Sequence, residues 1–384
     1  MSLDVDALRA REFPWTTRGG AIFMNAASTG PLPQSTVDVL SKWAQLRATP
    51  HLLTDHALFE TLARSRELLA TLVHASPQEI ALATNTGYGI NLAARALPLS
   101  KGDVIITPDL EFPANIYPWM AAARERGVEY RRVAFEPGTS IDEALERALD
   151  DVHVKCVAVS WVGFATGYRV DLARLGRACR ARGAYLVVDG IQGLGPCELD
   201  LGAMNVDIFA CGAQKWLLSP WGSGFVYVRR ALVASLEPPQ VSWMSPRGTD
   251  DFRRLLDYDL TWRDDARRFE FVTLPFQDFA GLNASLELFA ELTPREVADY
   301  VSSLADEIVR WAEASGIALL TPADRARRAG VVAVKPKDAE RASERLRAAG
   351  VTHSLREGAI RLAPHIYNTM DEVRAVLSIV ERSS

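Results

Sequence analysis

The stretch YLVVDGIQGLGPCELDLGAMNVDIFACGAQKWLLSPWGSGFVYV, residues 185–228, decides the fold of this chain. It contains three apolar runs, which are Tyr185–Val188, Val206–Cys211 and Phe225–Val228. Apolar runs of this length are typical of buried strands in a parallel sheet. Asp189 follows the first run directly, and Lys215 follows the second run after a turn of small residues. The stretch therefore predicts strands that bring an acid and a lysine to one edge of a sheet.

An acid and a lysine at such an edge suit one cofactor, pyridoxal phosphate (PLP). Its ring attracts electrons only while the ring nitrogen is protonated, and a carboxylate such as Asp189 keeps the proton there. A lysine amine such as Lys215 holds the cofactor as a Schiff base, and burial lowers its pKa toward the nucleophilic form. The alternative is an acid that ends a strand and a lysine on a polar loop. Asp207 is the rival acid, but it stands at the start of a strand, away from that edge.

The segments DGIQ, 189–192, and QKWLLSPWGSGFVYV, 214–228, resemble fold type I PLP enzymes of the class V aminotransferase family. That family also contains cysteine desulfurases, kynureninases and proteins similar to isopenicillin N epimerase. The resemblance implies an α/β fold with a mostly parallel, seven-stranded sheet between helices in a large PLP-binding domain, residues 17–280. It also implies a smaller C-terminal α/β domain, residues 281–384, which takes in residues 1–16.

The resemblance assigns the phosphate of PLP to the turn that opens the helix through Asn91–Ala96. Backbone N–H groups at a helix N-terminus favour an anion, although a threonine N-cap explains the turn about as well. Thr86 and Gly87, with Asn85, match the family's phosphate turn.

Other residues of the expected cofactor site follow from the same resemblance. Phe112 takes the place of a ring-stacking aromatic or histidine, with a core phenylalanine as the alternative. Some relatives have an asparagine where Phe164 stands, so Gln192 is the expected polar neighbour of the ring hydroxyl. Gln214, next to the lysine, is assigned to the cofactor site as well. Thr273 matches a threonine that in relatives reaches the phosphate of the other subunit, which predicts a homodimer with shared sites.

The expected substrate contacts lie near the two ends of the chain. Arg361 stands in a predicted strand before APHIYNT and matches the arginine that binds the substrate carboxylate in the family. The planar guanidinium group of an arginine can bind a carboxylate with two hydrogen bonds. The alternative is an ordinary surface arginine. Asn25 and Ala27 lie in NAASTGPLP, which borders the substrate pocket in the family, or is a plain turn.

The composition excludes several other classes of protein. The chain has 384 residues and a net charge of −5, and it lacks a basic nucleic-acid patch. Arg325, Arg327 and Arg328 cluster on a predicted loop and are expected to be a solvated surface. Four cysteines show neither CxxC pairs nor metal spacing, which predicts buried thiols in a reducing compartment and no metal. No apolar run is long enough to span a membrane, so a cytoplasmic protein is expected.

The predicted function is PLP chemistry at the α-carbon of an amino acid or amine, with an aminotransferase-type reaction in amino-acid metabolism. Epimerisation or racemisation, and β-elimination by a carbon–sulfur lyase, share its first steps and remain alternatives. A non-catalytic PLP-binding protein is a more remote one. A persulfide-forming cysteine desulfurase is not expected, because the stretch Ala349–Arg361 contains no cysteine and Phe112 replaces a histidine that could move protons.

Overall fold

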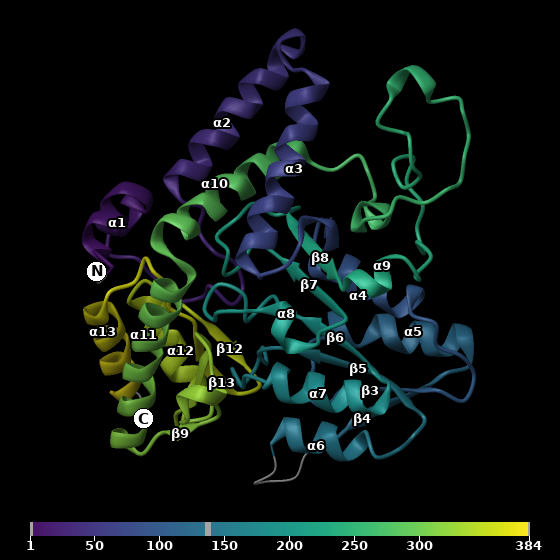
Figure 1. The fold of residues 1–384 in the computed structure, drawn as a ribbon. Coiled ribbons are helices and arrows are strands. Elements are labelled where there is room, and N and C mark those ends of the chain that lie inside the picture. The colour runs from purple at the N-terminus through teal and green to yellow at the C-terminus, as the bar shows by residue number, and fades with distance from the viewer. Residues whose placement is uncertain (1–2, 135–139, 383–384) are drawn as a thin grey trace.

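The computed structural model describes residues 3–134 and 140–382. Figure 1 shows a large sheet surrounded by helices, with a smaller α/β unit from the C-terminal part of the chain packed beside it. The strand order of the large sheet is β2 (Ile80–Leu82), β8 (Gly224–Val228), β7 (Ile208–Gly212), β6 (Tyr185–Asp189), β5 (Val154–Ser160), β3 (Val104–Pro108) and β4 (Glu129–Val133). This order confirms the predicted mostly parallel sheet of seven strands.

One strand of the large sheet departs from the sequence interpretation. The run Phe225–Val228 was expected to be parallel, but β8 is antiparallel to both β7 and β2. A parallel return requires a crossover connection of a dozen or more residues, usually with a helix. The link from Gly212 to Gly224 is a loop without such a helix, so the chain turns back along its own strand.

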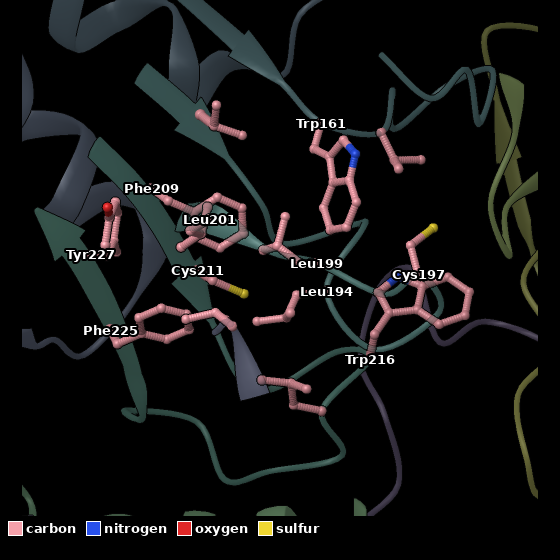
Figure 2. Close-up of a cluster of buried hydrophobic side chains, with 14 of the residues drawn as sticks. Trp161, Leu194, Cys197, Leu199, Leu201, Phe209, Cys211, Trp216, Phe225 and Tyr227 are labelled. Atoms are coloured by element: carbon pink, nitrogen blue, oxygen red, sulfur yellow. The ribbon is translucent and has the colours of Figure 1, made fainter. Parts of the chain in front are cut away.

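Helices cover both faces of the large sheet. Strand residues alternate between the faces, so Leu186 and Val188 join one apolar cluster while Val187 joins another. The first cluster includes residues of α3 (Asp55–Leu72), α7 (Leu172–Arg182) and α10 (Phe276–Leu292), and the second includes α4 (Thr86–Ala96) and α5 (Tyr117–Arg126). Figure 2 shows the first cluster around Phe209, Phe225 and Trp216. Burial on both faces explains why these strands are apolar throughout.

The other α-helices among the described residues up to 292 are α1 (Val5–Glu12), α2 (Gln34–Ala48), α6 (Ile141–Ala148), α8 (Leu201–Met204) and α9 (Arg230–Val233). Helix α10 packs along α2 and α3 (Figure 1). Helix α5 was not predicted from the sequence. Among the described residues, no helix is long and apolar enough to cross a membrane.

The C-terminal unit contains an antiparallel sheet of four strands. Their order is β12 (Ser354–Arg356), β13 (Ala359–Leu362), β10 (Val332–Lys335) and β9 (Ala318–Leu319). A third apolar cluster joins this sheet to α11 (Pro294–Ser315), α12 (Ala339–Ala348) and α13 (Met370–Glu381). The short strand β1 (Ile22–Phe23) pairs in parallel with β11 (Val351–Thr352), which brings the segment after Met24 against this unit.

Two of the three arginines clustered at the edge of this unit are not on the solvated surface that the sequence suggested, whereas Arg325 is exposed as expected. Arg328 is only 6% exposed and forms an ion pair with Asp306. Arg327 lies 3.0 Å from a carboxylate oxygen of Asp142, a fully buried residue of α6. Acids distant in the sequence neutralise these charges, which loop composition alone could not reveal. The contact of Arg327 with Asp142 also ties the C-terminal unit to the large sheet's helices.

Candidate active site

Asp189 and Lys215 lie at the edge of the large sheet where its parallel strands end. Asp189 is the last residue of β6, and Lys215 follows the end of β7 in a short turn. Gly190 directly after the acid is required by packing, because a Cβ there would stand 1.8 Å from the ring of Phe209. The fold therefore brings together the acid and the lysine that the sequence singled out.

The electrostatics of the two residues are coupled. Asp189 is 3% exposed, and burial raises its pKa to about 6. A hydrogen bond of 3.0 Å from the amide of Ile191 and the charge of Lys215 both lower this pKa and so oppose the effect of burial. Burial lowers the pKa of Lys215, Asp189 opposes this shift, and the positive charge of Arg361 adds to it. The amine is thus shifted toward its neutral, nucleophilic form.

The N-terminus of α4 offers an anion site close to this edge. Asn85 is the N-cap, and its side-chain oxygen accepts a hydrogen bond of 3.0 Å from the amide of Tyr88. The hydroxyl of Thr86 accepts a hydrogen bond of 2.8 Å from the amide of Gly212, so its own proton is left to donate. The amides of Thr86 and Gly87 bond to no residue in the described part of the chain. Three donors can therefore face one anion.

Phe112 lies over Lys215, with 5.7 Å between the lysine Nζ and the centroid of its ring. The ring is 42% exposed, so it is not the core phenylalanine that was the alternative interpretation. It meets the ring of Phe164 at 5.2 Å between centroids and an angle of 70°. This position is compatible with stacking on a ring held by Lys215.

The two glutamines differ in how their side chains are used. The amide nitrogen of Gln192 donates to the carbonyl of Ala27 over 2.9 Å, and its oxygen accepts from the indole of Trp216 over 2.9 Å. One N–H of Gln192 is left for a ligand. The side-chain oxygen of Gln214 is buried and has no hydrogen-bond partner within the described residues. Its backbone carbonyl accepts from the amide of Gly30 over 2.8 Å.

Arg361 lies in β13 and is 3% exposed, which rules out the surface arginine that was the alternative. Its Nη1 donates to the carbonyl of Phe164 over 2.9 Å, and its Nη2 donates to the hydroxyl of Ser28 over 2.9 Å. Weaker contacts of Nη2 reach Ser354 and the side-chain oxygen of Asn25. No acid of residues 3–134 or 140–382 forms an ion pair with it, and its buried Nε has no partner there. Burial lowers the pKa of Arg361 to about 10.

Thr273 stands apart from this group. It is exposed, just before α10, and no hydrogen bond joins it to the other predicted site residues that the structure describes. Its expected role depends on a second subunit. The rival acid Asp207 accepts from the amide of Leu186 and pairs with Arg229 over 2.8 Å, which is a structural role.

Sequence reasoning missed several residues of the site. Glu111 accepts hydrogen bonds of 3.0 Å from both the amide and the hydroxyl of Ser160, and one from Asn115. Burial and the charge of Asp189 together raise the pKa of Glu111 to about 8, against the opposing effect of the hydrogen bonds from Asn115 and Ser160. Ser28 and the carbonyl of Phe164 were missed as partners of Arg361. Only the position of Glu111 directly before Phe112, just after β3, could have signalled its place.

The donor set fits PLP. One edge of the sheet carries a lysine with a lowered pKa, a buried acid and an anion site. Two buried polar atoms, the side-chain oxygen of Gln214 and the Nε of Arg361, have no partner among the described residues, and a ligand could satisfy them. No cluster of metal-binding side chains occurs in the described ranges.

Comparison with known proteins agrees with this chemistry. Isopenicillin N epimerase of Streptomyces clavuligerus is 30% identical over 91% of this chain and 92% of its own length. A probable cysteine desulfurase of Methanothermobacter thermautotrophicus is 29% identical over 75% of this chain and 71% of its own length. The structure of a cysteine desulfurase from Thermococcus onnurineus has a TM-score of 0.83, with 21% identity, over 100% of this chain and 98% of that one, and so shares the fold.

The family known as aminotransferase class-V matches residues 22–376, which is most of the chain and spans every predicted site residue. Its members use PLP, in agreement with the residues at the sheet edge. The chain therefore belongs to the aminotransferase class-V family and is a PLP-dependent enzyme.

Proposed function

We propose that this enzyme acts at the α-carbon of an α-amino acid in an aminotransferase-type reaction. The observation that carries the proposal is the buried charge of Arg361 beside the lysine site. A buried cation without an acid partner is costly, and a substrate carboxylate would neutralise it with two hydrogen bonds. The positive charge of Arg361 lowers the pKa of Lys215, so the two groups act on each other. A substrate whose carboxylate is bound by Arg361 would therefore present its amine to the cofactor.

Each residue of the proposed site has a distinct task. PLP, when bound, supplies the electron sink that makes the α-proton acidic. Lys215 would hold the cofactor and, once the substrate amine has taken its place, would carry the α-proton on its neutral Nζ. Asp189 holds the proton on the ring nitrogen. Burial raises the pKa of Asp189 to about 6, and a cationic ring beside it would lower that pKa, so that the carboxylate would be charged when the cofactor is bound.

Other residues hold the cofactor in place. The phosphate would be bound at the N-terminus of α4. The donors there come from Thr86 and Gly87, and Asn85 is the N-cap of the helix. Phe112 would cover the ring, and the remaining N–H of Gln192 would be available to the ring hydroxyl. Gln214 positions the lysine turn through its bond to Gly30 and adds a buried oxygen to the site. Asn25 and Ala27 border the substrate, because Asn25 contacts Arg361 and Ala27 holds Gln192.

Two other reactions start in the same way. Epimerisation returns the proton to the opposite face of the α-carbon, and the 30%-identical isopenicillin N epimerase supports this alternative. β-Elimination expels a sulfur group instead. Phe112 has no titratable group, so the ring over Lys215 cannot act as the second acid or base of an epimerisation. A PLP-binding protein without catalysis is the remote alternative, since both Lys215 and Asp189 are in place.

The burial of the cysteine thiols argues against a desulfurase that forms a persulfide on the protein. All four cysteines are buried, and burial raises the pKa of Cys197 and holds that of Cys211 well above its usual value. Figure 2 shows Cys211 among Leu194, Phe209 and Phe225, and Cys197 beside Trp216. A thiol that stays protonated and enclosed cannot take sulfur from a substrate.

The experiment is a panel of L-amino acids with purified holoenzyme and a 2-oxo acid acceptor. Release of the 2-oxo acid of the donor supports transamination. Conversion to the D-form, with solvent deuterium at the α-carbon, would instead establish epimerisation. Sulfide released from cysteine without a protein persulfide would establish a lyase. A panel with no cofactor absorbance change and no product would refute catalysis on amino acids.

The proposal also includes a homodimer, a two-domain chain and a cytoplasmic location. Exposed apolar side chains support the dimer, because Trp243, Tyr258 and Leu260 are 46%, 88% and 69% exposed around a groove of about 840 Å³ that charged residues also line. Exposed apolar surface of this kind is typical of interfaces. The buried, unpaired cysteines support a reducing compartment. The division into residues 17–280 and 281–384 with 1–16 stays a prediction that limited proteolysis can test; its outermost residues lie outside the described ranges.

A further inference from the structure

A second arginine, Arg356, stands beside Arg361 in the sheet of the C-terminal unit. In the antiparallel pairing of β12 and β13, Ser354 lies opposite Arg361, and Arg356 lies opposite Ala359. Side chains two residues apart on a strand point to the same face, so Arg356 shares the face of Ser354 and Arg361. The hydroxyl of Ser354 lies 3.4 Å from the Nη2 of Arg361 on this face. Arg356 is therefore a diagonal cross-strand neighbour of Arg361, at a spacing that long side chains can bridge.

The hairpin that carries Arg356 is fixed by its turn. Glu357 and Gly358 connect β12 to β13 and have φ angles of 47° and 70°. Two-residue turns with positive φ at both positions match the twist of the strands and set their register. The place of Arg356 beside Arg361 is therefore determined by the backbone of the hairpin.

The two faces of this hairpin have different surroundings. Leu355 and Ile360 point to the opposite face, where they join the apolar cluster with α11, α12 and α13. On the face of Arg361 the contacts run to the large unit, through the carbonyl of Phe164 and the hydroxyl of Ser28. Arg361 is buried on this face and Arg356 is exposed. The two arginines therefore lead from the enclosed part of the site toward solvent.

The two positive charges act on each other without an acid between them. Burial lowers the pKa of Arg361, and the charge of Arg356 lowers it further, as expected for neighbouring cations. No carboxylate of the described ranges forms an ion pair with either arginine. Like charges on neighbouring strands repel, and an anion that contacts both arginines would relieve the repulsion.

One substrate carboxylate leaves Arg356 without a partner. The α-carboxylate of an amino acid occupies Arg361 in the proposed function, while Arg361 also donates to Phe164 and Ser28. The guanidinium group of Arg356 then lies beside the bound α-carboxylate and has no acid of its own. A second carboxylate farther along the same molecule could bind there through two charge-assisted hydrogen bonds.

We propose that Arg356 binds a second carboxylate of the substrate, so that the enzyme acts on an amino acid with an acidic side chain. This inference rests on the proposed function, because it takes Lys215 and Arg361 as the groups that receive the amine and the α-carboxylate. It makes Arg356 a specificity-determining residue. Its charge selects among amino acids and takes no part in moving the α-proton.

The test is an equilibrium titration of the holoenzyme, followed by the absorbance of the cofactor, with two matched pairs of amino acids. L-Aspartate is compared with L-asparagine, and L-glutamate with L-glutamine, so that size is kept within a pair and only the charge changes. At least one acid should bind about tenfold or more tightly than its own amide, because hydrogen bonds between charged groups are stronger than those of a neutral amide. The pair with the larger ratio gives the length of side chain that the two arginines span.

Three variants test whether Arg356 is the source of this preference. Arg356→Gln should bring the ratio of acid to amide affinity close to one, while the affinity for the amide, held through Arg361, stays within about twofold. Arg356→Lys keeps the charge and should keep most of the preference. Arg347→Gln is the matched control, because it removes the same charge from α12, which packs on the opposite face of the sheet. It should leave the ratio unchanged.

Each contrary outcome points to a different failure. Amides that bind the wild type as tightly as their acids would overturn the inference and leave the proposed reaction on amino acids intact. An unchanged ratio in a folded Arg356→Gln variant would also overturn it, as would an equal loss in Arg347→Gln, which would show an effect of net charge alone. If no amino acid changed the absorbance of a cofactor fixed to Lys215, the proposed function and the inference would fail together.

Discussion

The amide of Gly212 at the end of β7 donates a hydrogen bond of 2.8 Å to the hydroxyl of Thr86 in the first turn of α4. This bond fixes the anion site of the helix against the strand that leads to Lys215. Both groups are buried, so the bond is shielded from water. One contact between residues far apart in the sequence therefore links the two ends of the proposed cofactor site.

Replacement of Thr86 tests this contact. Thr86→Val keeps the shape but leaves the amide of Gly212 buried without a partner and removes a hydroxyl donor from the anion site. The cost of such an orphaned group is about 1–3 kcal/mol. The PLP dissociation constant should therefore rise about tenfold or more, and the cofactor-free protein should melt at a lower temperature. Thr86→Ser is the matched control and should restore both. Equal PLP affinity in the valine variant would show that Thr86 has no part in the site.

Asp189 predicts an unusual pH dependence of stability. Its pKa is raised to about 6 in the folded protein, so the folded state holds a proton that the unfolded state has released. The stability that this group contributes is complete below its unfolded pKa and is lost as the pH rises through about 6. Cofactor-free Asp189→Asn should match the wild type at pH 4 and exceed it at pH 8 by up to about 3 kcal/mol.

The same variant should behave in the opposite way in catalysis. Asp189→Asn removes the charge that holds the proton on the ring nitrogen, and turnover should fall by orders of magnitude. Denaturant unfolding of the cofactor-free protein and steady-state kinetics of the holoenzyme separate the two effects. Lower stability at pH 8 together with normal turnover would contradict the assigned role. Asp207→Asn is the control, and it should reduce stability because it breaks the contact with Arg229.

We expect replacement of Arg361 to weaken substrate binding much more than cofactor binding. Arg361→Ala should raise KM for an amino acid about 30-fold or more, since breaking a buried charged pair costs about 2–5 kcal/mol. PLP affinity should change much less. The matched control uses a different substrate: the amine that lacks the carboxylate should bind the wild type and the variant about equally. A KM that rises equally for the amine, or not at all for the amino acid, would remove Arg361 from the substrate site.

Thr273 predicts a site shared between subunits. If it reaches the partner's phosphate, a dimer of one Lys215→Ala chain and one Thr273→Asp chain has one intact site and one site with both changes. Mixing the two inactive proteins and allowing subunits to exchange should then restore about a quarter of the wild-type activity. Sedimentation gives the oligomeric state of each sample. An active monomer, or mixing without recovery despite exchange, would reject the shared site.

The sequence predicted the parts of this protein that depend on local patterns. Apolar runs and turns located the strands that carry Asp189 and Lys215, because burial on both faces leaves a continuous apolar signature. The parallel order of the sheet followed from strands that alternate with helices. The reversed direction of β8 did not, since an apolar strand looks the same in either direction and only the loop from Gly212 to Gly224 decides it.

Contacts between distant segments lay beyond local patterns. Ser28 meets Arg361, and Asp142 meets Arg327, only because the C-terminal unit packs against two distant parts of the chain, the segment before α2 and helix α6. The ion pair of buried Arg328 is with Asp306 of α11, within the C-terminal unit itself. Gln192 could be placed near the site from its distance to Asp189, but its bond to Trp216 required the folded loop. Thr273 remains a prediction, because its proposed partner belongs to another subunit.

The attachment of the cofactor to Lys215 tests the central claim most directly. Holoenzyme is treated with borohydride, digested, and mapped for the peptide that retains the cofactor. The account predicts a single labelled peptide containing Lys215, and Lys215→Ala should retain no covalent label and no turnover. Label on a peptide containing Lys155 or Lys335, with Lys215 unmodified, would contradict it.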